Sequence, residues 1–235
     1  MSPPNAGSAT PPDAAPAGLT GEHVGRRPDG TVQERAAFAD GRLHGETVVM
    51  DDEGRVRQRM AFRNGRPHGE AVLYNRGQLA ARRTYNDGVA EGPALFYGPT
   101  GDVAARQTLA RGKLNGEALV YNANGGIVRR ESYADDVLHG ERTDYDDGGR
   151  VLAQTTFVRG LPEGQSLRYW DNGEVMERTV YRDGKPLRTE MFDRRGRPLP
   201  PPGRQGAGGR PGLLARIGQA VAKPFQALAK LVTGE

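Results

Sequence analysis

Histidine recurs at one fixed position of this chain, just before a Gly-Glu pair, and imidazoles held close together could bind a metal ion. The histidines at this position are His44, His68 and His139. In other copies the position holds Glu91, Asn115 or Glu163, and no pair of ligands has the spacing that zinc sites use. We therefore interpret these histidines as polar turn residues, and we predict no metal site and no cofactor.

A column of glutamates at a second fixed position is the other arrangement that could do chemistry. Its members are Glu22, Glu46, Glu70, Glu117 and Glu141. Catalysis by a pair of carboxylates requires two different environments, so that the two pKa values separate. A repeated position gives every glutamate the same environment. We therefore expect ion pairs with strand arginines such as Arg59, Arg83 and Arg130, and we predict that the protein is not an enzyme.

The phrase that carries both columns is a repeat, best seen at residues 64–70 as Asn-Gly-Arg-Pro-His-Gly-Glu. Its second glycines are Gly21, Gly45, Gly69, Gly92, Gly116, Gly140 and Gly164. Successive glycines are 24, 24, 23, 24, 24 and 24 residues apart. A fixed period in this range indicates a repeat array, in which each unit mainly contacts its neighbours.

Two columns of large side chains lie between the glycines. Five residues after the second glycine come Met50, Tyr74, Tyr97, Tyr121, Tyr145 and Tyr169. Seventeen residues after it come Phe38, Phe62, Leu109, Tyr133, Phe157 and Tyr181, with Tyr85 matching after a one-residue deletion. Around these columns the side chains follow a period of two, for example over residues 151–157, which is typical of β-strands.

Asn-Gly and Asp-Gly pairs separate the predicted strands and favour tight hairpins, because these residues accept positive φ. The pairs are Asn64-Gly65, Asp87-Gly88, Asn124-Gly125, Asp147-Gly148, Asn172-Gly173 and Asp183-Gly184. Each repeat therefore predicts one β-hairpin. The predicted fold is all-β: an elongated single-layer antiparallel meander of about seven stacked hairpins and about 14 strands, plus a C-terminal amphipathic helix.

The repeat accounts for residues 21–196, and the flanking segments differ in composition. Residues 1–20 are rich in proline and alanine, which predicts disorder. Residues 197–211 are rich in proline, glycine and arginine, which predicts a linker. Residues 212–233 follow a spacing of three or four, which predicts a basic amphipathic helix. Its candidate binding residues are the apolar Leu214, Ile217, Val221, Phe225, Leu228 and Leu231 and the basic Arg216, Lys223 and Lys230.

The formal net charge of +4 is unevenly distributed. From Arg194 onward there are eight basic residues and one acidic residue, whereas residues 1–193 contain 25 basic and 28 acidic residues. The array is mildly acidic and the basic segment has no platform for base stacking, so we expect no nucleic acid as a partner. We find no cysteine, no secretory signal and no run of 18 apolar residues, so we expect a cytoplasmic protein.

The phrase Asn/Asp-Gly-x-x-His-Gly-Glu, followed at fixed spacing by tyrosine, glycine and a second aromatic residue, resembles the MORN repeat. It is most similar to the variant repeat of the bacterial YwqK-type antitoxin family, over about residues 21–196. The resemblance implies a β-hairpin array that binds other proteins or lies near membranes, and an antitoxin or immunity partner of a toxin. Pro93 and Gln165 depart from it by replacing the glutamate, and Asp136 replaces a turn glycine.

A single-layer sheet leaves one face open, and an open face with aromatic side chains is typical of a protein-binding surface. The candidate contacts are Tyr74, Tyr97, Tyr121, Tyr145 and Tyr169. We predict that this face covers a toxin or effector. The alternative is a scaffold or adaptor at the inner membrane surface, with residues 212–233 bound to anionic lipid. The helix could also dock on the sheet or in a groove of another protein, and the oligomeric state is left open.

Overall fold

The computed structural model describes residues 18–200, and the prediction of an all-β fold is confirmed for them. Residues 1–17 and 201–235 lie outside the described part of the chain. The predicted helix at 212–233, most of the predicted linker and most of the predicted N-terminal tail fall there. Between residues 18 and 200, no helix is long and apolar enough to cross a membrane.

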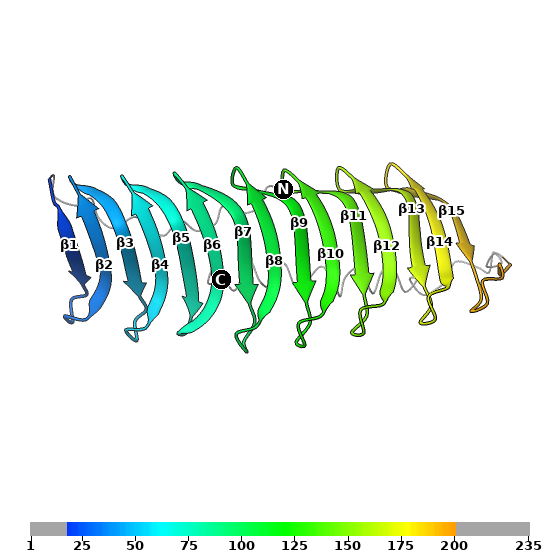
Figure 1. The fold of residues 1–235 in the computed structure, drawn as a ribbon, viewed down its shortest axis with the longest axis horizontal. Helices are drawn as coiled ribbons and strands as arrows, with labels where there is room; N and C mark the ends of the chain where they lie inside the picture. The colour runs from blue at the N-terminus through cyan, green and yellow to red at the C-terminus, as the bar shows by residue number, and fades with distance from the viewer. Residues whose placement is uncertain (1–17, 201–235) are drawn as a thin grey trace. The chain divides into compact units, whose positions relative to one another are not determined.

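Fifteen strands form the described part of the chain (Figure 1). They are β1 (Gly21–Arg26), β2 (Val32–Ala39), β3 (Arg42–Met50), β4 (Val56–Arg63), β5 (Arg66–Asn75), β6 (Gln78–Asn86), β7 (Val89–Tyr97), β8 (Val103–Ala110), β9 (Lys113–Tyr121), β10 (Ile127–Ala134), β11 (Val137–Tyr145), β12 (Val151–Val158), β13 (Leu161–Tyr169), β14 (Val175–Arg182) and β15 (Lys185–Met191). The count exceeds the expected 14 by one, because residues 185–191 add a strand after the last full repeat.

The chain divides into two compact units, the first ending at Gly101 and the second beginning at Asp102. Within each unit, strands that are neighbours in the sheet are also neighbours in the chain. All pairings within β1–β7 and within β8–β15 are antiparallel. The predicted antiparallel hairpin meander is therefore confirmed within each unit.

Two-residue turns connect each even-numbered strand to the odd-numbered strand that follows it within its unit. In the turn Asn64-Gly65 the φ angles are 52° and 79°, as the Asn-Gly signal predicts. Asp136 takes the place of a turn glycine and keeps a φ of 68°. Its carboxylate accepts a hydrogen bond from the backbone N–H of Leu114 at 2.7 Å, which helps an aspartate to hold this conformation.

Wider loops connect most odd-numbered strands to the next even-numbered strand. The Asp146 carboxylate accepts hydrogen bonds from the backbone N–H groups of Gly148 and Arg150, both at 2.9 Å. Gly149, rather than the pair Asp147-Gly148, has positive φ, at 80°. The prediction of a tight turn at Asp147-Gly148 is therefore wrong, because the Asp146 side chain organises a longer loop. The same wider loop occurs at the predicted turns Asn124-Gly125 and Asn172-Gly173.

One face of the sheet in the first unit buries small side chains that lie opposite one another on neighbouring strands. The buried residues of this face include Ala36, Thr47, Ala71, Ala81 and Ala94, together with the larger Phe38, Leu43 and Phe96. We call it the alanine face. In the second unit, Ala105, Ala118 and Val120 are the corresponding buried residues nearest its start.

The second aromatic column lies on the alanine face, where each aromatic residue is opposite a second glycine. Phe38 pairs with Gly21, and Phe62 pairs with Gly45. Gly45 has a φ of +101°, and a Cβ added there would lie 3.2 Å from the Cβ of Ala37. The backbone angle and the close neighbour together require glycine at this position.

Candidate functional site

The opposite face of the sheet carries three columns of side chains, and we call it the striped face. In the first unit these columns are acidic (Glu22, Glu46, Glu70), basic (Arg35, Arg59, Arg82) and large (Met50, Tyr74, Tyr97). Directly opposite residues on neighbouring strands share a face of the sheet. Val48 lies between Arg35 and Arg59 in this register, so aliphatic side chains separate successive arginines.

The second unit repeats the three columns. They are Glu117 and Glu141, then Arg106, Arg130 and Arg178, then Tyr121, Tyr145 and Tyr169. Gln154 replaces an arginine, and its Oε1 accepts a hydrogen bond from the Tyr169 hydroxyl at 2.9 Å. The five tyrosines predicted as partner contacts therefore share the striped face of their own unit, and all five are half-buried. Their role in binding stays a prediction.

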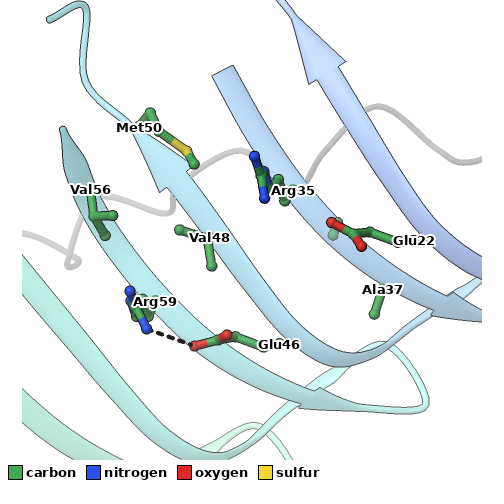
Figure 2. Close-up of a pocket in the computed structure, with 9 residues that line it drawn as sticks. Glu22, Arg35, Ala37, Glu46, Val48, Met50, Val56 and Arg59 are labelled. Carbon is green, nitrogen blue, oxygen red and sulfur yellow. Dashed lines mark ion pairs between the residues drawn. The ribbon is translucent and has the colours of Figure 1, made fainter. Parts of the chain in front are cut away.

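A groove of about 460 Å³ opens on the striped face of the first unit (Figure 2). Its charged lining residues are Glu22, Arg35, Glu46 and Arg59, and its apolar lining includes Ala37, Val48, Met50 and Val56. The lining residues come from β1, β2, β3 and β4, and Figure 2 shows their side chains around the groove. An apolar floor with charged side chains around it can bury part of another molecule while fixing its orientation.

Loose ion pairs connect the acidic and basic columns. The distances are 3.8 Å for Arg59–Glu46, 3.7 Å for Arg82–Glu70 and 3.3 Å for Arg130–Glu117. The predicted pairing is therefore confirmed for Arg59 and Arg130. It is wrong for Arg83, which lies on the alanine face opposite Ala71 and Ala94. Arg82 takes its place, because this repeat is one residue shorter than the others.

About half of each of these arginine side chains is exposed to solvent, and exposed ion pairs of this kind contribute only about 0–1 kcal/mol to stability. The arginine column was missed as a functional feature at the sequence level. Its signal is an arginine 14 residues after the second glycine, as at Arg59 and Arg130.

The histidine column connects neighbouring hairpins within a unit. Each of the following side chains accepts a hydrogen bond from the backbone N–H of the turn one hairpin further on: His68 from Asp87 at 3.4 Å, His139 from Arg159 at 3.5 Å and Glu163 from Asp183 at 2.7 Å. The interpretation of His68 and His139 as polar residues that hold turns is therefore supported, but the prediction that they lie in turns is wrong, because they lie within β5 and β11 and bind the turn of the next hairpin. Among residues 18–200, no group of three or more His, Asp or Glu side chains could hold a metal ion.

Sequence reasoning also missed a buried ionic cluster on the alanine face of the second unit. The Asp144 carboxylate accepts hydrogen bonds from Nε of Arg129 at 2.6 Å and Nε of Arg142 at 3.1 Å. The Tyr133 hydroxyl donates to Glu131 at 2.9 Å. The side chains of Arg129 and Glu131 are only 5% and 6% exposed. The sequence signal is a pair of opposite charges two residues apart in one strand, as at Arg129 and Glu131. From the sequence alone, such charged side chains would be assigned to the solvent-exposed face.

The phenol of Tyr133 and the carboxyl group of Asp146, both in the second unit, have shifted pKa values. Burial raises the pKa of Tyr133 above its usual range, and the neighbouring Glu131 carboxylate adds to the effect. The backbone N–H of Arg150 lowers the pKa of Asp146 by hydrogen bonding to its carboxylate. Both shifts belong to groups that hold strands or loops together, and neither group lies in the groove.

Comparisons with known proteins do not place the chain in a family. No protein-family model matches it, and no curated protein matches it. A Glycosylation Associate Protein (Gap123) complex from Streptococcus agalactiae is 20% identical, over 44% of this chain and 19% of that chain, with a TM-score of 0.29. A GtfA/B complex bound to UDP and GlcNAc is 16% identical, over 46% of this chain and 21% of that chain, with a TM-score of 0.22. A porin-like protein from Bacteroides uniformis is 12% identical, over 70% of this chain and 81% of that chain, with a TM-score of 0.22. Because all three TM-scores are low, no functional argument follows from these structures.

Proposed function

We propose that this chain is a non-enzymatic repeat protein that binds another protein through its striped face. One observation carries the proposal: the basic position of the striped face is an arginine in six of seven repeats, with glutamine in the other. Its residues are Arg35, Arg59, Arg82, Arg106, Arg130, Gln154 and Arg178. The next residue in each repeat lies on the alanine face and varies widely, as Ala36, Met60, Arg83, Gln107, Glu131, Thr155 and Thr179.

Folding alone does not account for this recurrence of arginine. A half-exposed arginine paired at 3.3 to 3.8 Å adds little to stability, so the fold would tolerate other residues there. Arginine and tyrosine are, by contrast, among the residues most enriched at positions that dominate protein–protein binding energy. Both stand in parallel columns on this one face of each unit. A binding role therefore explains the pattern better than a structural role.

The loose ion pairs of the striped face could be replaced by ion pairs with a bound protein. The guanidinium of Arg59 lies 3.8 Å from Glu46, which is longer than a good charge-assisted hydrogen bond. A carboxylate on a partner could bind the same guanidinium with better geometry while its apolar side chains enter the groove beside Val48. The striped face is therefore suited to a protein surface that combines acidic and apolar residues.

The class of partner comes from the resemblance to the variant MORN repeats of YwqK-type antitoxins. On that basis the partner is a toxin or effector, the chain is its antitoxin or immunity protein, and the two meet in the cytoplasm. The basic amphipathic pattern of residues 212–233 favours a second candidate function, a scaffold or adaptor at the inner membrane surface.

Affinity capture with matched variants tests the proposal. The full-length chain is tagged and captured from its native cells as wild type, as Arg59→Glu/Arg82→Glu and as Arg76→Glu, a control in the turn between β5 and β6. We expect one stoichiometric protein with the wild type and the control, lost with the striped-face variant. That protein should be toxic when expressed alone and harmless when co-expressed with this chain. Equal capture by all three proteins would refute binding through the striped face.

Vesicle flotation separates the two candidate functions. Vesicles containing anionic lipid are mixed with the full-length chain and with a version truncated after Gly203. Flotation of the full-length chain alone, with no stoichiometric protein in the capture experiment, would favour the membrane scaffold. If neither the full-length chain nor the truncated chain floats with the vesicles, the membrane scaffold is excluded.

A further inference from the structure

The first strand of the sheet presents an open edge. Within residues 18–200, β1 is paired on one side only, with β2. Every residue of β1 is exposed except Gly25, which is half-buried. An edge strand carries a row of free backbone N–H and C=O groups, so it can pair with a strand of another chain.

The other terminal strand, β15, is protected against such pairing. Pro186 removes one backbone donor, and Lys185 places a charge at the start of the strand. At its far end, the backbone N–H of Leu199 donates to the carbonyl oxygen of Met191 at 2.8 Å. Strand β1 contains no proline, and among the described residues no comparable segment returns over its outer edge.

The residues of β1 are self-complementary about their centre. We propose that a second copy of this chain pairs with β1 in the antiparallel sense, about a two-fold axis at Val24. In that register Val24 faces its own symmetry mate, and Glu22 of each copy faces Arg26 of the other. His23 of each copy then faces Gly25 of the other. The axis therefore creates one apolar contact and two opposite-charge pairs, each of which stabilises neighbouring strands.

The charges of β1 support this arrangement because they are not used within the chain. Glu46 and Glu70, the equivalents of Glu22, each have an arginine within 3.8 Å. Glu22 has no ion pair among the described residues, and Arg26 makes only a hydrogen bond to the carbonyl oxygen of Gly30, at 2.9 Å. An acid and a base four residues apart on one strand thus remain available to a second copy.

Pairing at β1 would extend the striped face. Residues directly opposite in an antiparallel pair share a face, so the two copies would present their striped faces on the same side. Glu22 already lines the groove in Figure 2, at its β1 end. The two grooves would therefore lie next to each other across the axis, and one partner could contact both copies.

Charge reversal tests the proposal by sedimentation velocity on the full-length chain between about 1 and 100 µM. The wild type should shift toward twice its 25.4 kDa mass as concentration rises. Glu22→Arg alone and Arg26→Glu alone should each raise the dimer dissociation constant at least about tenfold, because two attractive pairs become repulsive. The double variant Glu22→Arg/Arg26→Glu restores opposite charges and should dimerise like the wild type.

Crosslinking locates the axis independently. The chain has no cysteine, so a single introduced cysteine reports one contact. Val24→Cys should form a disulfide-linked dimer under mild oxidation, whereas Val137→Cys, at a similarly exposed valine, should not. A monomer at all concentrations, a dimer that neither single reversal weakens, or equal crosslinking of both variants would overturn the proposal.

Discussion

The second glycines differ in how much room surrounds them, and this difference predicts a difference in stability between two variants. Gly140 and Gly164 stand at the same position in successive repeats of the second unit. A Cβ added at Gly140 would lie 2.9 Å from the Cβ of Ser132, whereas a Cβ at Gly164 would have no atom within 4 Å. Gly140→Ala should therefore destabilise the protein more than Gly164→Ala.

The expected magnitudes follow from the backbone angle and the contact. Gly164 has a φ of +73°, near the left-handed well, so alanine there should cost about 1–2 kcal/mol. Gly140 has a φ of +111°, outside that well, and strain of this kind costs about 1–3 kcal/mol. The contact with Ser132 adds an overpacking cost of about 1–3 kcal/mol. Gly140→Ala should therefore lose about 2–6 kcal/mol of unfolding free energy.

Urea unfolding of the full-length chain, followed by far-ultraviolet circular dichroism, measures the two losses. Amide hydrogen exchange should place the loss in β10 and β11, because each repeat mainly contacts its neighbours. Ser132→Gly in the Gly140→Ala background removes the close contact and should recover part of the loss. Equal destabilisation by the two alanine variants, or no recovery with Ser132→Gly, would refute the steric argument.

The ionic cluster and the loops of the second unit lead to three further expectations. Asp144→Ala removes the carboxylate that Nε of Arg129 contacts at 2.6 Å and should cost about 3 kcal/mol in urea unfolding, since a buried ion pair is broken. The pKa of Tyr133 is raised in the fold by burial, so its stabilising contribution is complete below about pH 10 and lost as pH rises further. Tyr133→Phe should therefore flatten the alkaline fall in melting temperature. The pKa of Asp146 is lowered by the hydrogen bond from the Arg150 backbone N–H, so its contribution is present above about pH 4 and lost as pH falls. Asp146→Asn should lower the melting temperature at neutral pH and flatten its acid dependence. An unchanged pH profile in either variant would contradict the assignment.

The repeat, the strands and the glycine positions were predictable from the sequence because each has a fixed period. The face on which an arginine lies was less predictable. In the pair Arg82-Arg83, a shift of one residue moves a side chain from one face of the sheet to the other. The deletion in this repeat lies upstream, in the turn at Arg76-Gly77, so counting from the glycine selects the wrong arginine.

The buried ionic cluster was unpredictable for a different reason. Arg129 and Asp144 are distant in the chain and become neighbours only through the register of β10 and β11. Their burial depends on the side chains that surround them on the alanine face. Sequence alone assigns charged residues in strands to the solvent side, because isolated charges are rarely buried unless they are paired. The pairing that permits burial appears only once the register is known.

The striped face is continuous in the first unit and interrupted in the second. Thr143 takes a position that is aliphatic in the other repeats, is 2% exposed and donates its hydroxyl to Glu141 at 2.7 Å. Gln154 takes the arginine position, and its Oε1 accepts a hydrogen bond from the hydroxyl of Tyr169 at 2.9 Å. A glutamate and a tyrosine of the second unit are therefore held by hydrogen bonds within the chain.

Arg178, the arginine that follows this interruption in the column, is also less available to a partner. The guanidinium of Arg178 lies 5.4 Å from the ring centre of Phe192 and 3.7 Å from Glu190. Arg59, by contrast, lines the groove and has one loose contact, with Glu46. If the striped face binds the partner, Arg59→Glu should weaken binding at least about tenfold more than Arg178→Glu in calorimetric titration with the captured partner, because a committed side chain has less to offer a new contact. Equal losses would show that both units bind, and a larger loss at Arg178 would place the principal contact in the second unit.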